Sequence, residues 1–377
     1  MLRTLFFLAG LIIIASSFAC MQSTQFPRGA VNTVLTPPKL LHVYNGTSLG
    51  FYTSTGAYGF GTLAKSVFSA AYGNAAQMVQ HTVLGGGTFY IGASCASCAT
   101  VTYFNGYAGG YKFSAEAVSK FTVFTGNKSQ GIALNNRQNI LYATDTTNKG
   151  ITFFNSQTGG YGAGGTSGFS FAGPPLSLQY LTVDSLNDLL VATDPTGGRV
   201  YFMDGVTGAD LGSTLINGAC AGYTTLGHAI TSDSLHISYV ICKGTNARVV
   251  LISTTTQAVL ATVNVPTITT ATDLTYNTTN GKIIVVGGTK AISMNAADGS
   301  GFVTFDTNTA PCNVATATLS AAVYDSASST IFVSDSTNSV IYKIDAATMT
   351  WKDITSCTNS SFSVAADLSA PTRIGFF

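Results

Sequence analysis

Short apolar runs alternate with small polar turns along most of the chain, and one combination of the two returns at a steady interval. Each copy is an apolar strand, then Asn, Asp or Ser, then a polar turn that often ends in Gly. The seven copies are centred on Asn45, Asn105, Asn155, Asp204, Ser253, Asn295 and Asp345, which by subtraction lie 60, 50, 49, 49, 42 and 50 residues apart. Such a period is typical of repeat architectures in which each unit is one supersecondary motif.

A second shared stretch lies upstream of most of these anchors. In GIALNNRQNILYATD and YLTVDSLNDLLVATD, an apolar strand meets an Asn or Asp turn and then a β-branched or aromatic strand, which predicts a hairpin. Each unit therefore predicts four antiparallel strands with two largely apolar faces. Radial packing of the units buries both faces of every sheet, so we expect an all-β fold, a seven-bladed β-propeller of four-stranded antiparallel blades.

The two ends of the repeat region predict how the ring closes. The segment from Val364 to Phe377 resembles only the first two strands of a unit, and the sequences LLHVYN and LGFYTST around Asn45 resemble only the last two. We expect these two pairs to form one shared blade, which would protect two exposed edges. The stretch from Gly56 to Asn74 is expected to be a long loop.

The repeated motifs resemble a known class of propeller. The strand pattern [LIV]-[YF]-x-[ASTV]-[TSD]-D and the turn of the V-x-x-I-D-A-A-T type, best matched by YKIDAATMT, resemble the YVTN, NHL and quinoprotein-like repeats. The resemblance covers nearly all of the mature chain and implies the propeller fold, but such motifs do not specify an activity. Enzymatic propellers that resemble this one, of the gluconolactonase and peptidyl-amide lyase types, hold a metal near the central channel.

The amino terminus predicts export. Arg3 precedes an apolar run from Leu5 to Phe18, and Ser17 and Ala19 supply the small residues that signal peptidase requires. We expect a signal peptide over residues 1–19, a linker over 20–37, and a single propeller domain over 38–377. The chain is then secreted, or periplasmic or on the cell surface if bacterial, and no integral membrane span is expected because no second long apolar stretch follows.

Composition narrows the function classes and predicts the disulfides. Charged residues make up 9% of the chain and the net charge is +1. Such a composition does not provide the basic surface that binding of a nucleic acid requires, so no nucleic-acid partner is expected. Without Cys20, an even number of cysteines remains, which in an exported chain favours disulfides. Nearest-neighbour pairing is the simplest connectivity, and it joins Cys95 with Cys98, Cys220 with Cys242, and Cys312 with Cys357. Cys95 and Cys98 could instead be half of a zinc site, but no second C-x-x-C exists.

Candidate site residues gather where inner strands are expected. Alignment of the units places His81 and His228 on innermost strands, His42 and His236 on outer strands, and Asp273 and Asp367 at the start of other inner strands. The candidate binding residues at the channel mouth are therefore His81, Gln130, Gln179, His228, Asp273 and Asp367. The two channel histidines could hold a metal with help from the two carboxylates, but two polar residues on separate strands are more often simple lining.

No assembled catalytic set accompanies these residues. Nucleophile and phosphate-binding motifs are absent, Glu116 is the only Glu, and Trp351 is the only Trp, so no cofactor is expected. The recurrent Asp residues are expected to serve turns. Asn127 and Asn359 are candidate glycan acceptors in expected connections. We therefore expect a non-catalytic binding or scaffold protein for a glycan, peptide or protein partner, with a metal-dependent lactonase, hydrolase or lyase that uses the central channel as the alternative.

Overall fold

In the computed structural model the chain forms two units, Met1–Thr36 and Pro37–Phe377. Every residue that the structure describes lies in the second unit. The described residues are 39–59, 61–62, 67–69, 77–81, 88–92, 100–105, 120–122, 131–145, 149–162, 168–171, 177–220, 225–244, 246–353, 357, 360–364 and 366–376. These residues form β-strands and one short 3-10 helix, η1 (Ala366–Leu368). The expectation of an all-β fold is confirmed.

The described strands form seven antiparallel sheets, six of four strands and one of five. The first three along the chain are β1 (Leu41–Tyr44), β2 (Ser48–Tyr52) and β3 (Val67–Ser69) with β29 (Arg373–Phe376); β4 (Met78–His81), β5 (Thr88–Gly92), β6 (Thr100–Asn105) and β7 (Lys120–Thr122); and β8 (Ile132–Asn135), β9 (Ile140–Asp145), β10 (Gly150–Asn155) and β11 (Gly168–Ser170).

The next four sheets follow the chain in the same way. They are β12 (Leu181–Asp184), β13 (Leu189–Asp194), β14 (Arg199–Asp204) and β15 (Asp210–Leu215); β16 (Thr225–Ser232), β17 (Ile237–Lys243), β18 (Arg248–Ser253) and β19 (Val259–Asn264); β20 (Asp273–Asn277), β21 (Lys282–Gly287), β22 (Lys290–Asn295) and β23 (Val303–Asp306); and β24 (Leu319–Asp325), β25 (Thr330–Asp335), β26 (Val340–Asp345), β27 (Thr350–Trp351) and β28 (Ser361–Ser363).

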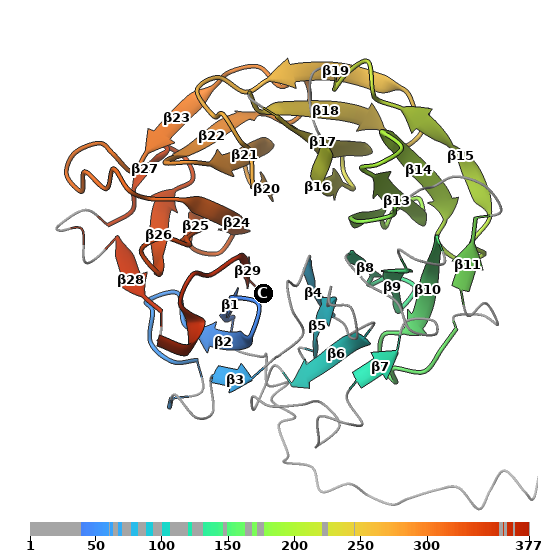
Figure 1. Ribbon diagram of the computed structural model, residues 1–377, viewed down its shortest axis with the longest axis horizontal. Coiled ribbons are helices and arrows are strands. Elements are labelled where there is room, and N and C mark those ends of the chain that lie inside the picture. The colour runs from blue at the N-terminus through green and yellow to red at the C-terminus, as the bar shows by residue number, and fades with distance from the viewer. Residues whose placement is uncertain are drawn as a thin grey trace, which may run out of the picture. The chain divides into compact units, whose positions relative to one another are not determined.

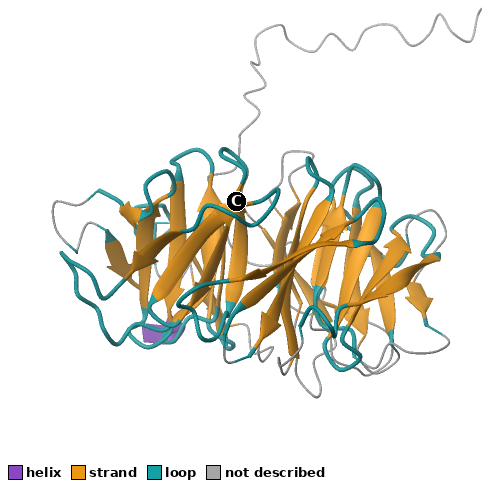
Figure 2. Ribbon diagram, turned by 90° about the horizontal axis from the view of Figure 1, so that it is seen from above, coloured by secondary structure: helices purple, strands orange, loops and turns teal. Residues whose placement is uncertain are grey.

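The sheets stand radially around a common axis, and their innermost strands are β29, β4, β8, β12, β16, β20 and β24 (Figure 1). The side view shows the strands running between two ends that carry the turns and loops (Figure 2). This is a β-propeller with four-stranded antiparallel blades. At one end, which we call the turn face, lie the described turns that join the first strand to the second and the third strand to the fourth in the sheets from β8 to β27. Backbone bonds tie these two turns together, for example from Gly205 N to Asp188 O at 2.7 Å.

One sheet is closed by both ends of the described chain, but not in the expected proportion. We expected two strands from each end, whereas one carboxy-terminal strand, β29, pairs with three amino-terminal strands, β1 to β3. The difference arises because β3 forms inside the stretch that was expected to be a loop. The other carboxy-terminal strand, β28, instead pairs with β26 at the outer part of the preceding sheet.

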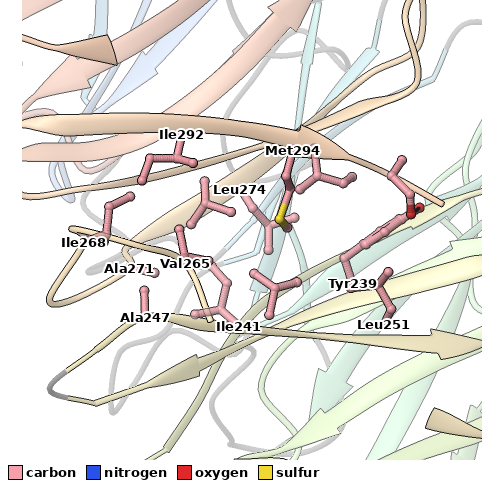
Figure 3. Packing of buried hydrophobic residues seen from close by; sticks show 14 of the residues in the cluster. Tyr239, Ile241, Ala247, Leu251, Val265, Ile268, Ala271, Leu274, Ile292 and Met294 are labelled. Atoms are coloured by element: carbon pink, nitrogen blue, oxygen red, sulfur yellow. Dashed lines mark hydrogen bonds between the residues drawn. The ribbon is translucent and has the colours of Figure 1, made fainter. Parts of the chain in front are cut away.

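The core lies between neighbouring sheets, as expected for strands with two apolar faces. Tyr239, Ile241 and Leu251 of one sheet pack against Leu274 and Met294 of the next (Figure 3). Hydroxyl groups add directional contacts across the same boundary, since the Tyr239 hydroxyl donates to the backbone oxygen of Ala296 at 2.8 Å. Apolar packing therefore holds the sheets together, and the tyrosine contact fixes the turn of one sheet against the strand of its neighbour.

The turns between first and second strands share a backbone feature that corrects the expected place of one histidine. The residue directly before the second strand has a positive φ in five sheets, at Asn139, Asp188, His236, Gly281 and Ser329. His236 was expected on an outer strand, but it occupies this left-handed turn position with a φ of 52°. His42 does lie away from the innermost strand, on β1, which is second in its sheet.

Candidate functional site

One register position at the start of the inner strands brings polar side chains together at the axis. The strand pairings align the last residues of these strands, since Asn135, Ser232 and Asn277 each face the first residue of the second strand. Counting back four residues from each such position gives one equivalent residue in each of the six sheets whose inner strand precedes the second strand in the sequence. In chain order these are Gln77, Gly131, Tyr180, His228, Asp273 and Ala321.

Gln77 is buried and its amide group joins four sheets. Its Oε1 accepts hydrogen bonds from the backbone N–H groups of Ile132 at 3.0 Å and Leu181 at 2.9 Å. Its Nε2 donates to the backbone oxygen of Leu181 at 2.7 Å and lies 3.2 Å from Nε2 of His228. Because two N–H groups point at Oε1, the amide has one favourable orientation, with its N–H groups toward Leu181 and His228.

His228 continues this network to the next inner strand. Its Nδ1 contacts Oδ1 of Asp273, and its ring lies edge-on to that of Tyr180 with centroids 5.7 Å apart. The arrangement is satisfied by the tautomer in which Nδ1–H donates to Asp273 and Nε2 accepts from Gln77. Both ring nitrogens are then engaged within the protein.

Asp273 is fully buried and remains ionised because its surroundings stabilise the charge. Burial by itself raises the pKa of this carboxyl, but the contact with His228, the charge of Arg373 and the backbone N–H of Ala322 together lower it below its ordinary value. The Ala322 N–H donates to Oδ2 at 3.1 Å, so the carboxylate also ties β20 to β24. The Asp273 carboxylate therefore links its own strand to side chains and backbone of the neighbouring inner strands.

We refer to Gln77, His228 and Asp273 as the axial network. The network spans the inner strands from β4 to β24 and joins them through side chains and backbone amides. The contacts of the network are all made to side chains and backbone groups of neighbouring inner strands. Among the described residues, no group of three or more His, Cys, Asp or Glu side chains is placed to hold a metal ion.

The structure places the expected channel residues at different heights and in different elements. His228, on the inner strand β16, is in contact at the axis with Asp273, which begins the inner strand β20. His81 does lie on an innermost strand, β4, but at its far end from Gln77. Asp367 was expected to begin an inner strand, but it lies in η1, and the inner strand of that sheet begins at Arg373.

Two candidates remain, Gln179 and Gln130. Gln179 is half-buried directly before Tyr180, whereas Gln130 lies outside the described residues. Both glutamines thus precede the axial register position by one residue. Gln77, which occupies that position, was missed. The signal that finds it is the count of four residues back from the end of the inner strand, applied to QMVQH as to the other units.

A second polar cluster lies on the turn face between two neighbouring sheets. The buried Asp184 carboxylate accepts hydrogen bonds from Nδ1 of His236 at 2.8 Å, Oγ1 of Thr254 at 2.6 Å and Nδ2 of Asn187 at 3.0 Å. Next to it, burial raises the pKa of Asp233, whose Oδ1 accepts the Ser185 N–H at 3.1 Å. The repeated Asp residues thus serve turns, as expected, and here also join adjacent sheets.

Two of the three expected disulfides are confirmed, Cys220–Cys242 and Cys312–Cys357. The first joins the segment after β15 to β17, and the second joins the segments that follow β23 and β27. The expected pair of Cys95 and Cys98 and the glycan acceptors Asn127 and Asn359 lie outside the described residues. In the part of the chain that is described, no helix has the length and apolar character needed to cross a membrane.

Comparison with known proteins identifies likeness of fold only. No protein-family model matches the chain, and no curated protein matches its sequence. Among solved structures, a nidogen/laminin complex chain is 12% identical with a TM-score of 0.48, covering 77% of this chain and 97% of that one. Hydrazine synthase of Kuenenia stuttgartiensis is 10% identical with a TM-score of 0.54, covering 69% of this chain and 73% of that one. The chain is thus a β-propeller that shares its fold with proteins of distant sequence.

Proposed function

We propose that this chain is a secreted, non-catalytic, seven-bladed propeller of the YVTN, NHL or quinoprotein-like type that binds a protein, peptide or glycan partner. The observation that carries the proposal is the axial network, in which Gln77, His228 and Asp273 are engaged with one another and with backbone amides. The seven sheets support the blade number, with one blade for each.

The location of the network matters because a catalytic propeller of the resembling enzyme types would need free groups at the same place. A general acid or base must be able to reach a substrate proton, and a metal ligand must offer a lone pair. In this structure Gln77 and Asp273 are in contact with the two ring nitrogens of His228. Binding at the surface of a rigid ring remains as the function that this chemistry supports.

Export is supported by the disulfides and by the amino-terminal sequence. Disulfides persist in oxidising compartments and are rare in the cytosol. Two cysteine pairs lie at bonding distance, and the apolar run from Leu5 to Phe18 has the form of a signal segment. Sequencing the amino terminus of protein recovered from the medium of a secreting host tests this part, with Cys20 as the expected first residue.

Binding is tested by panning the folded, immobilised protein against a displayed peptide library and a glycan array. We expect one class of ligand to be enriched, and we expect the enrichment to disappear on protein that has been reduced and unfolded. Equal retention by folded and unfolded protein, or no retention of any ligand, would contradict the proposal.

The metal-dependent alternative is tested by elemental analysis of the purified protein. We expect no stoichiometric zinc or calcium, and we expect His228→Ala to leave the metal content unchanged. Stoichiometric metal that is lost in His228→Ala, together with hydrolysis of a simple lactone that is lost in the same variant, would establish the enzymatic function instead.

A further inference from the structure

Asparagine is followed directly by glycine at four places in the sequence, which are Asn45, Asn105, Asn217 and Asn280. Such a pair can react within itself, because the backbone nitrogen of the glycine can attack the side-chain amide carbon of the asparagine. Glycine favours the attack, since it has no Cβ atom beside its nitrogen and adopts more backbone conformations than other residues. The fold then decides which pairs react. Both residues of the pair are described at Asn45, Asn217 and Asn280.

The side chain of Asn45 is held at both of its ends. Its Oδ1 accepts hydrogen bonds from the backbone N–H groups of Thr47 at 3.0 Å and Ser48 at 2.8 Å. Its Nδ2 donates to the backbone oxygen of Ser369 at 3.1 Å, and the glycine that follows Asn45 is buried. These bonds must break before the amide carbon can meet the glycine nitrogen, so the fold protects this pair.

Asn280 is exposed, but its side chain is held at one end. Its Nδ2 donates to the backbone oxygen of Ala346 in the neighbouring sheet at 3.3 Å. The glycine of this pair, Gly281, has a positive φ of 63°, and its backbone oxygen accepts the N–H of Ala296 at 2.9 Å. Bonds to two other turns therefore restrict the rotation that the attack requires.

Asn217 combines exposure with an amide that is not tied by hydrogen bonds. It lies in the turn over residues 217–220 that follows β15, and both Asn217 and Gly218 are exposed. The Asn217 side chain makes no hydrogen bond to a described residue, and its Oδ1 lies over Gly198. A Cβ atom on Gly218 would meet nothing within 4 Å. The peptide between the two residues therefore has room to rotate.

The turn that contains Asn217 also links two neighbouring sheets. It is closed by a hydrogen bond from the backbone N–H of Cys220 to the oxygen of Ile216 at 2.8 Å. Cys220 forms the disulfide with Cys242 on β17, in the next sheet along the chain. A covalent change at Asn217 would therefore alter the main chain directly beside this link.

We propose that Asn217 is a site of spontaneous modification, at which Asn217 and Gly218 form a succinimide that water opens to an aspartyl or isoaspartyl residue. The Gly218 nitrogen gives its proton to solvent base and forms a bond to Cγ of Asn217. The bond from Cγ to Nδ2 then breaks, and this nitrogen takes up a proton from solvent and leaves as ammonia. Addition of water to either carbonyl carbon of the ring reopens it and leaves a carboxylate in place of the amide. The reaction exchanges ammonia for water and needs no oxidant or reductant.

The test is peptide mapping by mass spectrometry of the folded mature chain, sampled over time at mildly alkaline pH. The measured quantity is the fraction of each Asn-Gly peptide that carries a carboxyl in place of the amide. We expect Asn217 to react about tenfold or more faster than Asn45, because the bonds that hold Asn45 add to its barrier. Asn280 should also react more slowly than Asn217. In reduced and unfolded protein, we expect all three to react at similar rates.

The matched variant is Gly218→Ala, which places a Cβ atom beside the attacking nitrogen, at a point where the structure leaves space for it. We expect this variant to be folded, as checked by circular dichroism, and to react at Asn217 about tenfold more slowly. A folded protein in which Asn45 or Asn280 reacts as fast as Asn217, or a rate at Asn217 that Gly218→Ala leaves unchanged, would each overturn the proposal.

Discussion

His42 shows at the scale of one residue how burial makes the fold sensitive to acid. The side chain is buried on β1, with its ring edge-on to Phe51 at a centroid distance of 4.9 Å. Burial lowers the pKa of His42 from its ordinary value of 6.5 to about 3. The imidazole therefore stays neutral in the folded protein over a range in which the unfolded chain takes up a proton.

Replacement of His42 should reduce this sensitivity. Above the unfolded pKa of 6.5 both states are neutral at this position, so His42 adds no pH dependence there. As the pH falls from 6.5 toward 3, the unfolded state binds a proton that the folded state rejects, and the free energy of unfolding falls by up to about 1.4 kcal/mol per pH unit. We expect His42→Phe to remove this slope in denaturant unfolding measured across the pH range.

A matched substitution at the half-exposed His236, His236→Gln, should leave the slope caused by His42 in place. If His42→Phe and the unaltered protein lose stability in parallel between pH 6.5 and 3, burial of the neutral imidazole is not the cause.

The inner strands show at the scale of elements how closely the sheets approach one another at the axis. A Cβ atom on Gly131 would lie 2.3 Å from the backbone oxygen of Gln179 and 2.8 Å from the backbone nitrogen of Leu181. The glycine thus permits β8 and β12 to come within reach of the Gln77 amide, which bonds to both strands.

We expect Gly131→Ala to destabilise the protein by about 1–3 kcal/mol, because the new methyl group must displace backbone rather than a flexible side chain. Gly218→Ala is the matched control, since a Cβ atom there meets nothing within 4 Å. Denaturant unfolding measures both variants. Equal stability of the two alanine variants would show that the close approach at Gly131 is relieved without cost.

Most of these elements could be predicted from the sequence, because a strand with two apolar faces and an Asn or Asp turn leaves few alternatives to radial packing. The prediction failed where the pattern is short. β3 has only three residues in a stretch rich in Gly and aromatic residues, so its pattern does not predict a strand. The sequence therefore predicted two strands from each end of the chain in the closing sheet, whereas three come from the amino-terminal end and one from the carboxy-terminal end.

The axial network was harder to predict than the sheets. Its register position holds Gln77, Gly131, Tyr180, His228, Asp273 and Ala321 in successive sheets, and no motif unites such different side chains. They meet because Gln77 and Asp273 bond to backbone N–H groups, which every residue carries. His228 and Asp273 could be identified as polar residues on inner strands, but the partner Gln77 required the register.

A disulfide links neighbouring sheets of the ring at their outer parts, in addition to the axial network at the inner strands. Cys312 follows β23 and Cys357 follows β27, so their disulfide links the outer parts of two adjacent sheets across a separation of 45 residues. A covalent link over a long loop restricts the unfolded chain more than the folded one.

We expect the double replacement Cys312→Ser with Cys357→Ser to lower the free energy of unfolding by about 2–4 kcal/mol, a typical contribution of one disulfide. Thermal and denaturant unfolding of the variant and the unaltered protein, both kept oxidised, provide the measurement. A variant as stable as the unaltered protein would mean that packing between the two sheets already supplies this restraint.

The place of β29 in the closing sheet determines when the ring can be completed. Every other described strand precedes β29 in the sequence, yet β29 takes the innermost place beside β1. During synthesis, the inner edge of β1 therefore stays unpaired until residues Arg373–Phe376 have been translated. A chain that lacks β29 leaves the inner edge of β1 without its partner, so the closing sheet keeps only its three amino-terminal strands.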